Sequence, residues 1–506
     1  MSSSAPGSPG PGLPPMPEHV RLARAGRRVD WRRIFFIVLG LGLFVTVLLS
    51  PPWPSAVDPV GETFELTREG KASIALFILA LVWWVFEVVP IGVTAITIGV
   101  VQALLLIRPA KVAFGDFMEP SVWFIIGSLV IGMVFTRTGL TKRMAYRVLV
   151  LVGERTSMIY LGCFLMTAAM THIMAHTAVA AAVFPLLMAI YSLYEEGDEP
   201  TRFGKGLFIG MAFVAGAGSI VTLLGAARGA VAIGFYNDIA GREIPFFELT
   251  WYMFPVGWVM TFLLWGFCMV VFPPERKTIP GLRERARHLH SRLGPPSKNE
   301  ILAVLIVLAT VGVMMARSFV PALEPLNKSA IILVSTILFF LLKILTLDDL
   351  EQLPWNIVLL FGGAMSIGLC MWQTGAASWM AVHWLVLFEG AHWFVFVMGV
   401  AVFVLVMTNV IMNVAAIAIC LPVALVIAGY LGVAPEVILY ASLVSAGMPF
   451  LLLIGAAPNA IAYGSGQFTS GEFFKAGIPA SILLMLVLGL FVWFVWPLMG
   501  MPILTG

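Results

Sequence analysis

A single arginine interrupts a long apolar segment near the middle of the chain. Arg228 is the one charged residue in the stretch 223–234, LLGAARGAVAIG. A guanidinium costs about 2.5–3.5 kcal/mol at the centre of a membrane helix on insertion scales, so it persists there only beside water or polar partners. Its planar fork of N–H donors matches a carboxylate or a sulfate. We therefore expect Arg228 to bind an anion; alternatively, it caps backbone carbonyls or pairs with Glu87.

Two histidines lie in another apolar stretch, 157–192. They are His172 and His176, and a hydroxyl follows the second at Thr177. An imidazole titrates near pH 6.5 when unperturbed, so it can bind an anion or carry a coupling proton. We expect His176 to act in one of these ways. The alternative for either histidine is a neutral ring that satisfies backbone groups of a helical hairpin.

Three polar side chains interrupt apolar sequence in the second half of the chain: Thr408, Asn413 and Asn459. Hydroxyl and amide groups hold small hard cations, and they also bind oxyanions. In the alternative interpretation they satisfy backbone groups at a helix break, which hydrocarbon cannot do.

The surrounding composition places these residues in a membrane protein. Of the 506 residues, 60% are apolar and 11% are charged, against about 45–50% and about 25% in soluble domains. A helix needs about 17–25 mostly apolar residues to cross a bilayer. We therefore expect an all-α polytopic membrane protein with no nucleic-acid partner. About eleven spans are expected, near 33–50, 71–89, 91–107, 121–137, 205–221, 250–272, 299–317, 328–346, 355–371, 435–450 and 473–497.

Two further apolar stretches have polar centres. They cover residues 157–192 and 393–428, and each is long enough for two ordinary spans. Their central Thr, His and Asn residues are too polar to face lipid. We therefore expect each stretch to form a re-entrant hairpin.

Two stretches are near copies of each other. Residues 223–234 read LLGAARGAVAIG, and residues 453–464 read LIGAAPNAIAYG. A break in a helix is tolerated in a bilayer only where the freed backbone groups are buried or line a cavity. One broken helix in each half is typical of secondary transporters built from two repeats. Further blocks recur 236 or 237 residues apart: Gly127 with Gly363, Gly132 with Gly368, Met144 with Met380, Thr171 with Thr408, and Pro185 with Pro422.

Basic residues predict how the chain crosses the membrane. Positive charge favours the cytoplasmic side, and it is concentrated before the first span and in residues 274–298. We expect a multi-pass protein of the cytoplasmic (inner) membrane, with the N-terminus inside, the C-terminus outside and two inverted repeats. The expected parts are a disordered cytoplasmic N-terminus (1–32), a first transmembrane helix with an outer loop (33–70), the first repeat (71–273), a basic cytoplasmic linker (274–298) and the second repeat (299–506).

Three segments resemble a known family. Residues 84–90, WVFEVVP, are similar to its W-x-x-E-x-x-P segment, and residues 361–375 to its G-G…T-G span. Residues 449–477 resemble its P-x-G-T-P-P-N-A-I-x-x-G…F-x-K-x-G segment. In this order the motifs resemble the divalent anion/sodium symporters (DASS), the solute carrier 13-like permeases, over about residues 71–497. The resemblance implies eleven spans, two re-entrant hairpins, two broken helices, an elevator-like homodimer, and dicarboxylates, tricarboxylates or sulfate as substrates.

The signature residues of that family have partly changed here. Each hairpin tip of the family carries Ser-Asn-Thr, which binds the substrate carboxylate and, with the facing broken helix, a sodium ion. The matching tips here are residues 175–177, AHT, and 412–414, MNV; the Pro-Pro-Asn loop is ARG at 227–229 in the first half. The resemblance implies substrate binding by Asn413, Asn459 and Thr177, and from their own chemistry we expect Arg228 and His176, which depart from the family pattern, to bind the substrate with them. It also implies cation binding by Thr408, Asn413 and Thr171, with sodium at Thr408 and Asn413.

We therefore expect a secondary active transporter that moves a small dianion, either a dicarboxylate or a sulfate-like anion, across the membrane by alternating access. The coupling ion is sodium or a proton, or a counter-anion is exchanged, and no other cofactor is expected. The expected partners are the anion, membrane lipids and a second copy in a homodimer. One alternative is a cation/proton antiporter or oxyanion exporter of the wider ion-transporter superfamily. The others are a channel and a membrane enzyme; the enzyme is disfavoured because the spans lack paired carboxylates, a metal cluster and a nucleophile–base spacing.

Overall fold

A computed structural model describes residues 30–57, 63–194, 200–385 and 390–505. These residues are mostly helical, and their sheet structure is one antiparallel pair, β1 (Ala56–Val57) with β2 (Thr63–Phe64). Among them, nine helices are long and apolar enough to cross a membrane. The expected class, an all-α multi-pass membrane protein, is confirmed. The expected disordered N-terminus (1–32) lies almost wholly outside the described residues.

The chain enters the fold through four helices and a short 3-10 turn. They are α2 (Trp31–Leu49), α3 (Arg68–Val85), α4 (Ile91–Leu104), α5 (Ala110–Gly115) and η1 (Asp116–Met118). The helices α2 and α3 pack together, and α4 packs along α17 (Trp355–Gln373) of the second half.

The first half continues with a long helix, a hairpin and a broken helix. Its elements are α6 (Pro120–Thr138), α7 (Leu140–Val152), α8 (Thr156–Thr171), α9 (His176–Tyr194), α10 (Arg202–Ser219), α11 (Ala227–Ala240) and α12 (Phe246–Val271). Gly139 has φ 84°, and this left-handed residue allows the sharp turn from α6 into α7.

The second half begins after a helix in the basic linker, α13 (Leu282–Arg292). Its elements are α14 (Lys298–Ala316), η2 (Pro321–Leu323), α15 (Lys328–Leu341), α16 (Leu347–Glu351), α17, α18 (Ala376–Leu385), α19 (Trp393–Val410), α20 (Asn413–Tyr430), α21 (Pro435–Gly447), η4 (Leu453–Gly455), α22 (Ala457–Tyr463), α23 (Ser470–Leu490), η5 (Phe491–Val495) and α24 (Trp496–Leu498).

Polar caps start several of these helices. The Thr201 hydroxyl accepts from the backbone of Gly204 at the start of α10. Ser297 with Glu300 caps α14, and Thr469 with Glu472 caps α23, each as a reciprocal capping box. These local signals fix where each helix begins, although most of its stability comes from packing.

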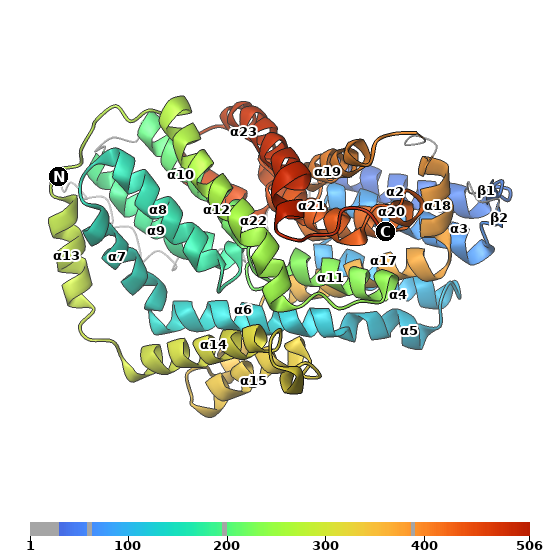
Figure 1. Ribbon diagram of the computed structural model, residues 1–506, viewed down its shortest axis with the longest axis horizontal. Coiled ribbons are helices and arrows are strands. Elements are labelled where there is room, and N and C mark those ends of the chain that lie inside the picture. The colour runs from blue at the N-terminus through green and yellow to red at the C-terminus, as the bar shows by residue number, and fades with distance from the viewer. Residues whose placement is uncertain (1–29, 58–62, 195–199, 386–389, 506) are drawn as a thin grey trace, which may run out of the picture.

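A hairpin followed by a broken helix occurs once in each half. The hairpin α8–α9 precedes the pair α10 and α11, and the hairpin α19–α20 precedes the pair α21 and α22. In Figure 1 the helices α7 and α13 lie at one end of the molecule, and α18 with β1 and β2 at the other. The helices α8 and α9 lie toward the first of these ends, and α19 and α20 toward the second. The count of eleven spans and the inversion of the two repeats stay predictions.

The two broken helices pack against each other's half. The helix α10 lies against α22, and α11 lies along α20. The rings of Phe213 and Phe450 are 4.4 Å apart between centroids. Gly216 lies so close to the end of α21 that an added Cβ would be 2.8 Å from the carbonyl oxygen of Gly447. This packing brings the interrupted regions of both halves together at the centre of the fold.

Candidate functional site

The first hairpin ends in a turn that binds the first helix break. We call residues 172–177 the first tip and residues 220–226, between α10 and α11, the first break. The backbone N–H of His176 donates to the carbonyl of Gly225 at 2.9 Å. The hydroxyl of Thr222 donates to the carbonyl of His172 at 2.6 Å. Tip and break therefore satisfy each other's backbone groups, which lipid could not do.

Two glycines allow this close approach. A Cβ on Gly225 would lie 2.5 Å from the carbonyl oxygen of Ser219 and 2.6 Å from that of Thr171. A Cβ on Gly218 would lie 2.3 Å from Thr171 Oγ1. Glycine is therefore needed at both positions, because any larger residue would prevent the hairpin from packing this closely against the first break.

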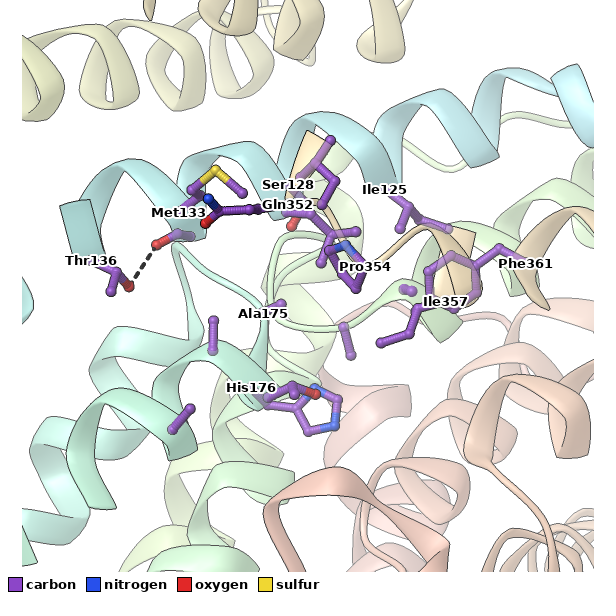
Figure 2. A pocket seen from close by; sticks show the side chains of 18 of the residues that line it. Ile125, Ser128, Met133, Thr136, Ala175, His176, Gln352, Pro354, Ile357 and Phe361 are labelled. Carbon is purple, nitrogen blue, oxygen red and sulfur yellow. Dashed lines mark hydrogen bonds between the residues drawn. The ribbon is translucent and has the colours of Figure 1, made fainter. Parts of the chain in front are cut away.

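A cavity of about 590 Å³ lies between α6, the first tip, the first break and the segment that leads into α17. Figure 2 shows Ala175 and His176 of the first tip below α6, which carries Ser128 and Met133, with the His176 ring farther from α6 than Ala175. The volume falls within the range of about 300–1,000 Å³ that is usual for small-molecule sites. Its polar or charged lining residues are Ser128, Thr136, Arg137, His176, Thr177, Asp349 and Gln352.

The two charged lining residues form an ion pair in which Arg137 is exposed and Asp349 is buried. Arg137 Nε is 3.0 Å from Asp349 Oδ1, and the Arg137 side chain is 59% exposed. Arg137 lies in the last turn of α6, just before α7, and α7 packs against α13 of the basic linker. The exposed Arg137 therefore marks the mouth of the cavity, beside the turn from α6 into α7.

Two helix N-termini face the cavity. The helix α9 begins at His176 and α11 begins at Ala227, and both residues line it. A helix N-terminus carries about half a positive charge and unpaired N–H donors. Among the described residues, Asp349 is the one carboxylate in the lining, and Arg137 pairs with it. The inner part of the cavity is therefore electrically suited to an anion.

The ring of His176 is fixed at this inner part. Its Nδ1 lies 3.2 Å from the carbonyl oxygen of Gly225, and the residue is 9% exposed. Donation from Nδ1 leaves Nε2 as the acceptor of a neutral ring; after protonation, Nε2 becomes a donor. His176 can therefore bind either a hydroxyl group or an anion, and the half-buried Thr177 adds a hydroxyl beside it.

His172, the first residue of the tip, does not line the cavity. Its Nδ1 is 3.1 Å from the carbonyl oxygen of Gly218, and its ring meets Trp258 edge-on at 5.6 Å between centroids. This placement fits the alternative interpretation, in which His172 satisfies the backbone of the hairpin.

Arg228 lies behind the first break and is almost completely buried. It is 1% exposed, and its Nη2 donates to Ser219 Oγ at 2.6 Å. Its Nη1 has no hydrogen-bond partner within the described part of the chain. The cavity lining includes Ala226 and Ala227 but not Arg228. The alternative partner, Glu87, is exposed and lies on a separate surface crevice at the end of α3.

The second half repeats the contact between tip and break. We call residues 408–414 the second tip and residues 448–456 the second break. Thr408 Oγ1 donates to the carbonyl of Ala446 at 3.1 Å. Asn409 Oδ1 accepts from the backbone N–H groups of Leu451 at 2.7 Å and Leu452 at 3.2 Å. Side chains thus replace the missing helix bonds of this break.

Two asparagines complete this second contact region. Asn459 Nδ2 donates to the carbonyls of Pro449 at 2.8 Å and Leu452 at 3.1 Å. Asn413 begins α20, is 6% exposed, and its Nδ2 has no partner among the described residues. Neither asparagine lines the 590 Å³ cavity.

The residues predicted from sequence therefore fall into separate groups. His176 and Thr177 line the cavity, and Arg228 lies behind it. Thr171 and Thr408, both expected at a cation site, contact different halves of the fold. Thr171 packs on Gly218 and Gly225, and its hydroxyl donates to the carbonyl of Ala168. Thr408 donates to the carbonyl of Ala446. The residues of the first half lie close to the second tip because α11, which contains Arg228, packs along α20, which begins at Asn413. The binding roles of all these residues stay predictions.

Several cavity residues escaped the sequence analysis. Ser128 donates to the carbonyl of Leu224 at 2.9 Å and so ties α6 to the first break. It directly follows Gly127 of the repeated glycine block, which was the available signal. Asp349 and Gln352 come from a short helical turn before α17 that no span pattern marks.

Comparisons with known proteins cover most of the chain. The family model described as the sodium:sulfate symporter transmembrane region matches residues 52–501. The sodium-dependent dicarboxylate transporter SdcS of Staphylococcus saprophyticus is 24% identical over 484 residues, which cover 91% of each chain. SdcS of Staphylococcus aureus strain bovine RF122 is 25% identical over 456 residues, 86% of this chain and 87% of that one.

A solved structure agrees with the fold. MtrF of Neisseria gonorrhoeae, described with a class of antimetabolite efflux pumps, superposes with a TM-score of 0.59 and 14% identity over 94% of this chain and 96% of that one. At this identity the similarity concerns the fold alone. The family match spans most of the sequence and confirms the resemblance carried by its motifs. The chain belongs to the sodium:sulfate symporter family of membrane transporters, the DASS family.

Proposed function

We propose that this protein is a secondary active transporter that carries a small dianion, a dicarboxylate or a sulfate-like anion, across the cytoplasmic membrane with sodium as the coupling ion. Family membership supports membrane transport, and the names of the relatives support sodium and a dicarboxylate. Transport is by alternating access, and the protein acts as a homodimer.

The cavity at the first tip is the observation that carries this proposal. One anionic group of the substrate binds the N-terminus of α9, where Thr177 adds a hydroxyl donor and His176 adds a second donor when its ring is protonated. The N-terminus of α11 supplies a second partly positive wall. Arg228 contributes long-range positive charge from behind the break, although its side chain does not line the cavity.

The coupling sodium ion binds at the second tip. Thr408 and Asn413 supply oxygen ligands there, and Asn459 holds the carbonyls of the second break in place. Hard cations such as sodium prefer hydroxyl, amide and carbonyl oxygens, and broken helices of transporters offer such carbonyls. Because α11 packs along α20, which begins at Asn413, ion binding at the second tip is mechanically linked to the cavity.

The cavity mouth at Arg137 and Asp349 is open toward one side in this conformation. Alternating access then requires a second conformation, in which the tips and breaks face the opposite side. The tip–break hydrogen bonds keep each hairpin attached to its broken helix, so that both move as one body.

Uptake by the purified full-length protein in proteoliposomes tests the proposal. Labelled succinate and labelled sulfate are supplied in parallel, with an inward gradient of sodium or of choline. We expect a sodium gradient to raise uptake of one of them at least tenfold, and the unlabelled anion to compete. Equal uptake in sodium and choline would remove sodium from the mechanism, and no uptake of either anion would contradict dianion transport.

A further inference from the structure

The guanidinium of Arg228 lies where two half-helices end. The helix α10 ends at Ser219, whose hydroxyl accepts from Arg228 Nη2 at 2.6 Å and donates to the carbonyl of Gly216 at 2.7 Å. The helix α21 ends at Gly447, and a Cβ built on Gly447 would lie 2.9 Å from Arg228 Nη2. The charge therefore fills the gap between the C-terminal ends of α10 and α21.

Backbone dipoles, rather than a carboxylate, balance this charge. Arg228 is 1% exposed and forms no ion pair within the described part of the chain. The C-terminal end of a helix carries about half a negative charge. Two such ends meeting at one point favour one monovalent cation. Because Nη1 has no hydrogen-bond partner, hydrogen bonds alone do not account for the position of this side chain.

Transporters with broken helices bind ions at the ends of their half-helices, which is where Arg228 lies. In broken helices, the C-terminal ends of half-helices and the unwound carbonyls coordinate sodium or protons. A side-chain cation that already fills such a position excludes a mobile one. We propose that Arg228 is a tethered cation that takes the place of a coupling sodium ion in the first half of the chain. The transporter then couples to sodium through its second half alone.

The second half lacks such a fixed charge. In the two similar stretches, Pro458 stands at the position of Arg228. The side chains at the second tip and break are neutral: Asn459 donates to two carbonyls of the break, and Thr408 donates to a third at the end of α21. A mobile cation is therefore needed there to supply the charge that Arg228 supplies in the first half.

The inference rests on the proposed function and fixes its coupling ratio. With one ion site, the initial rate of anion uptake should depend on sodium concentration with a Hill coefficient near one. A purely structural Arg228 would place no limit on the number of sodium ions. The coefficient and the ratio of ions to anion therefore distinguish the two roles.

The test combines stoichiometry with replacement of the side chain. In proteoliposomes, the wild type and Arg228→Lys should transport one sodium ion per anion, measured from the reversal potential, with a Hill coefficient near one. Arg228→Gly removes the charge and leaves space for an ion, so its coefficient should rise toward two. Arg147→Gln, which removes a positive charge from the exposed face of α7, serves as the matched control and should keep the wild-type value.

Sodium-dependent thermal shifts of the purified proteins give a readout that does not need transport. Sodium that binds the folded state raises the melting temperature by mass action. We expect sodium, compared with choline, to raise the melting temperature of Arg228→Gly more than that of the wild type. Two or more sodium ions per anion in the wild type would overturn the inference, even if no variant folds. Absence of anion uptake together with the larger sodium shift in Arg228→Gly would instead refute the proposed function and support the tethered cation.

Discussion

The backbone N–H of His176 donates to the carbonyl of Gly225 across 2.9 Å, and this bond joins the first residue of α9 to a helix break 49 residues further along the chain. The same carbonyl lies 3.2 Å from Nδ1 of the His176 ring. One acceptor therefore fixes both the helix end and the side chain that face the cavity. Binding groups held in this way are in place before the substrate arrives, which limits the entropic cost of binding.

The first prediction concerns Gly225, which allows the first tip and the first break to pack closely. Gly225→Ala would place a methyl group 2.5 Å from the Ser219 carbonyl oxygen and 2.6 Å from that of Thr171 at the end of α8, so the first hairpin and the first break must separate. Overpacking of this kind costs about 1–3 kcal/mol. We expect a lower melting temperature in detergent and loss of transport. Gly266→Ala is the control, because nothing lies within 4 Å of its added methyl group; an equal loss in both variants would contradict the account.

The second prediction concerns substrate affinity. His176→Gln removes the ring that lines the cavity and whose Nε2 becomes a donor to the anion once the ring is protonated. A hydrogen bond to a charged group contributes about 1.5–3 kcal/mol, so KM for the anion should rise about tenfold or more. Kinetics of labelled anion uptake measure this value. His383→Gln changes an exposed histidine on α18 and should leave KM unchanged; an unchanged KM in His176→Gln would remove that ring from the site.

The third prediction separates the second tip from the first. Asn459→Ala leaves the carbonyls of Pro449 and Leu452 without this donor, and the loss at the buried Pro449 carbonyl costs about 1–3 kcal/mol. Because the break is then less ordered, half-maximal activation should need a higher sodium concentration, with little change in anion KM at saturating sodium. Asn327→Ala removes the N-cap of α15 and serves as a stability control. A sodium shift of the same size in the control would contradict an ion-linked role for Asn459.

The fourth prediction is a pH dependence outside the spans. Glu243, in the loop between α11 and α12, lies 2.8 Å from Arg317 and 3.3 Å from Lys328. The hydrogen bond from Arg317 is the largest cause that lowers the pKa of Glu243. A lowered folded-state pKa stabilises the fold above the unfolded value, about 4.3, and this stabilisation is lost as the pH falls through the folded pKa.

Its measured size should be small. The Glu243 side chain is 42% exposed, and exposed ion pairs contribute about 0.2–1 kcal/mol. Glu243→Gln should therefore lower the melting temperature slightly at pH 7 and match the wild type near pH 3. A deficit that persists unchanged at the lower pH would show that the charge is not its cause.

Much of the architecture could be predicted because hydrophobic length and helix-breaking residues are local signals. The polar centres around His172 and Asn413 correctly marked two hairpins, and the repeated Gly-containing stretches marked both breaks. The small β1–β2 pair was not anticipated, because its two-residue strands carry no pattern.

The site was harder to predict, because the position of a residue in the sequence does not show in which direction its side chain points. Arg228 was expected to bind the anion. Its side chain instead points to the end of α10, where it donates a hydrogen bond to Ser219. The mouth pair Arg137–Asp349 joins α6 to a short helical turn of the other half. Only the folded arrangement brings such residues together.

The account depends most directly on a dianion occupying the cavity at the first tip. The four native cysteines are all buried, so Thr177→Cys would supply the one accessible thiol among the described residues. A water-soluble maleimide should label it through the mouth beside Arg137, whereas Arg147→Cys on the exposed face of α7 reports labelling away from the site. With sodium present, succinate or sulfate should slow labelling of Thr177→Cys at least fivefold and leave that of Arg147→Cys unchanged. Labelling of Thr177→Cys at the same rate with and without every dianion tried would contradict the central claim.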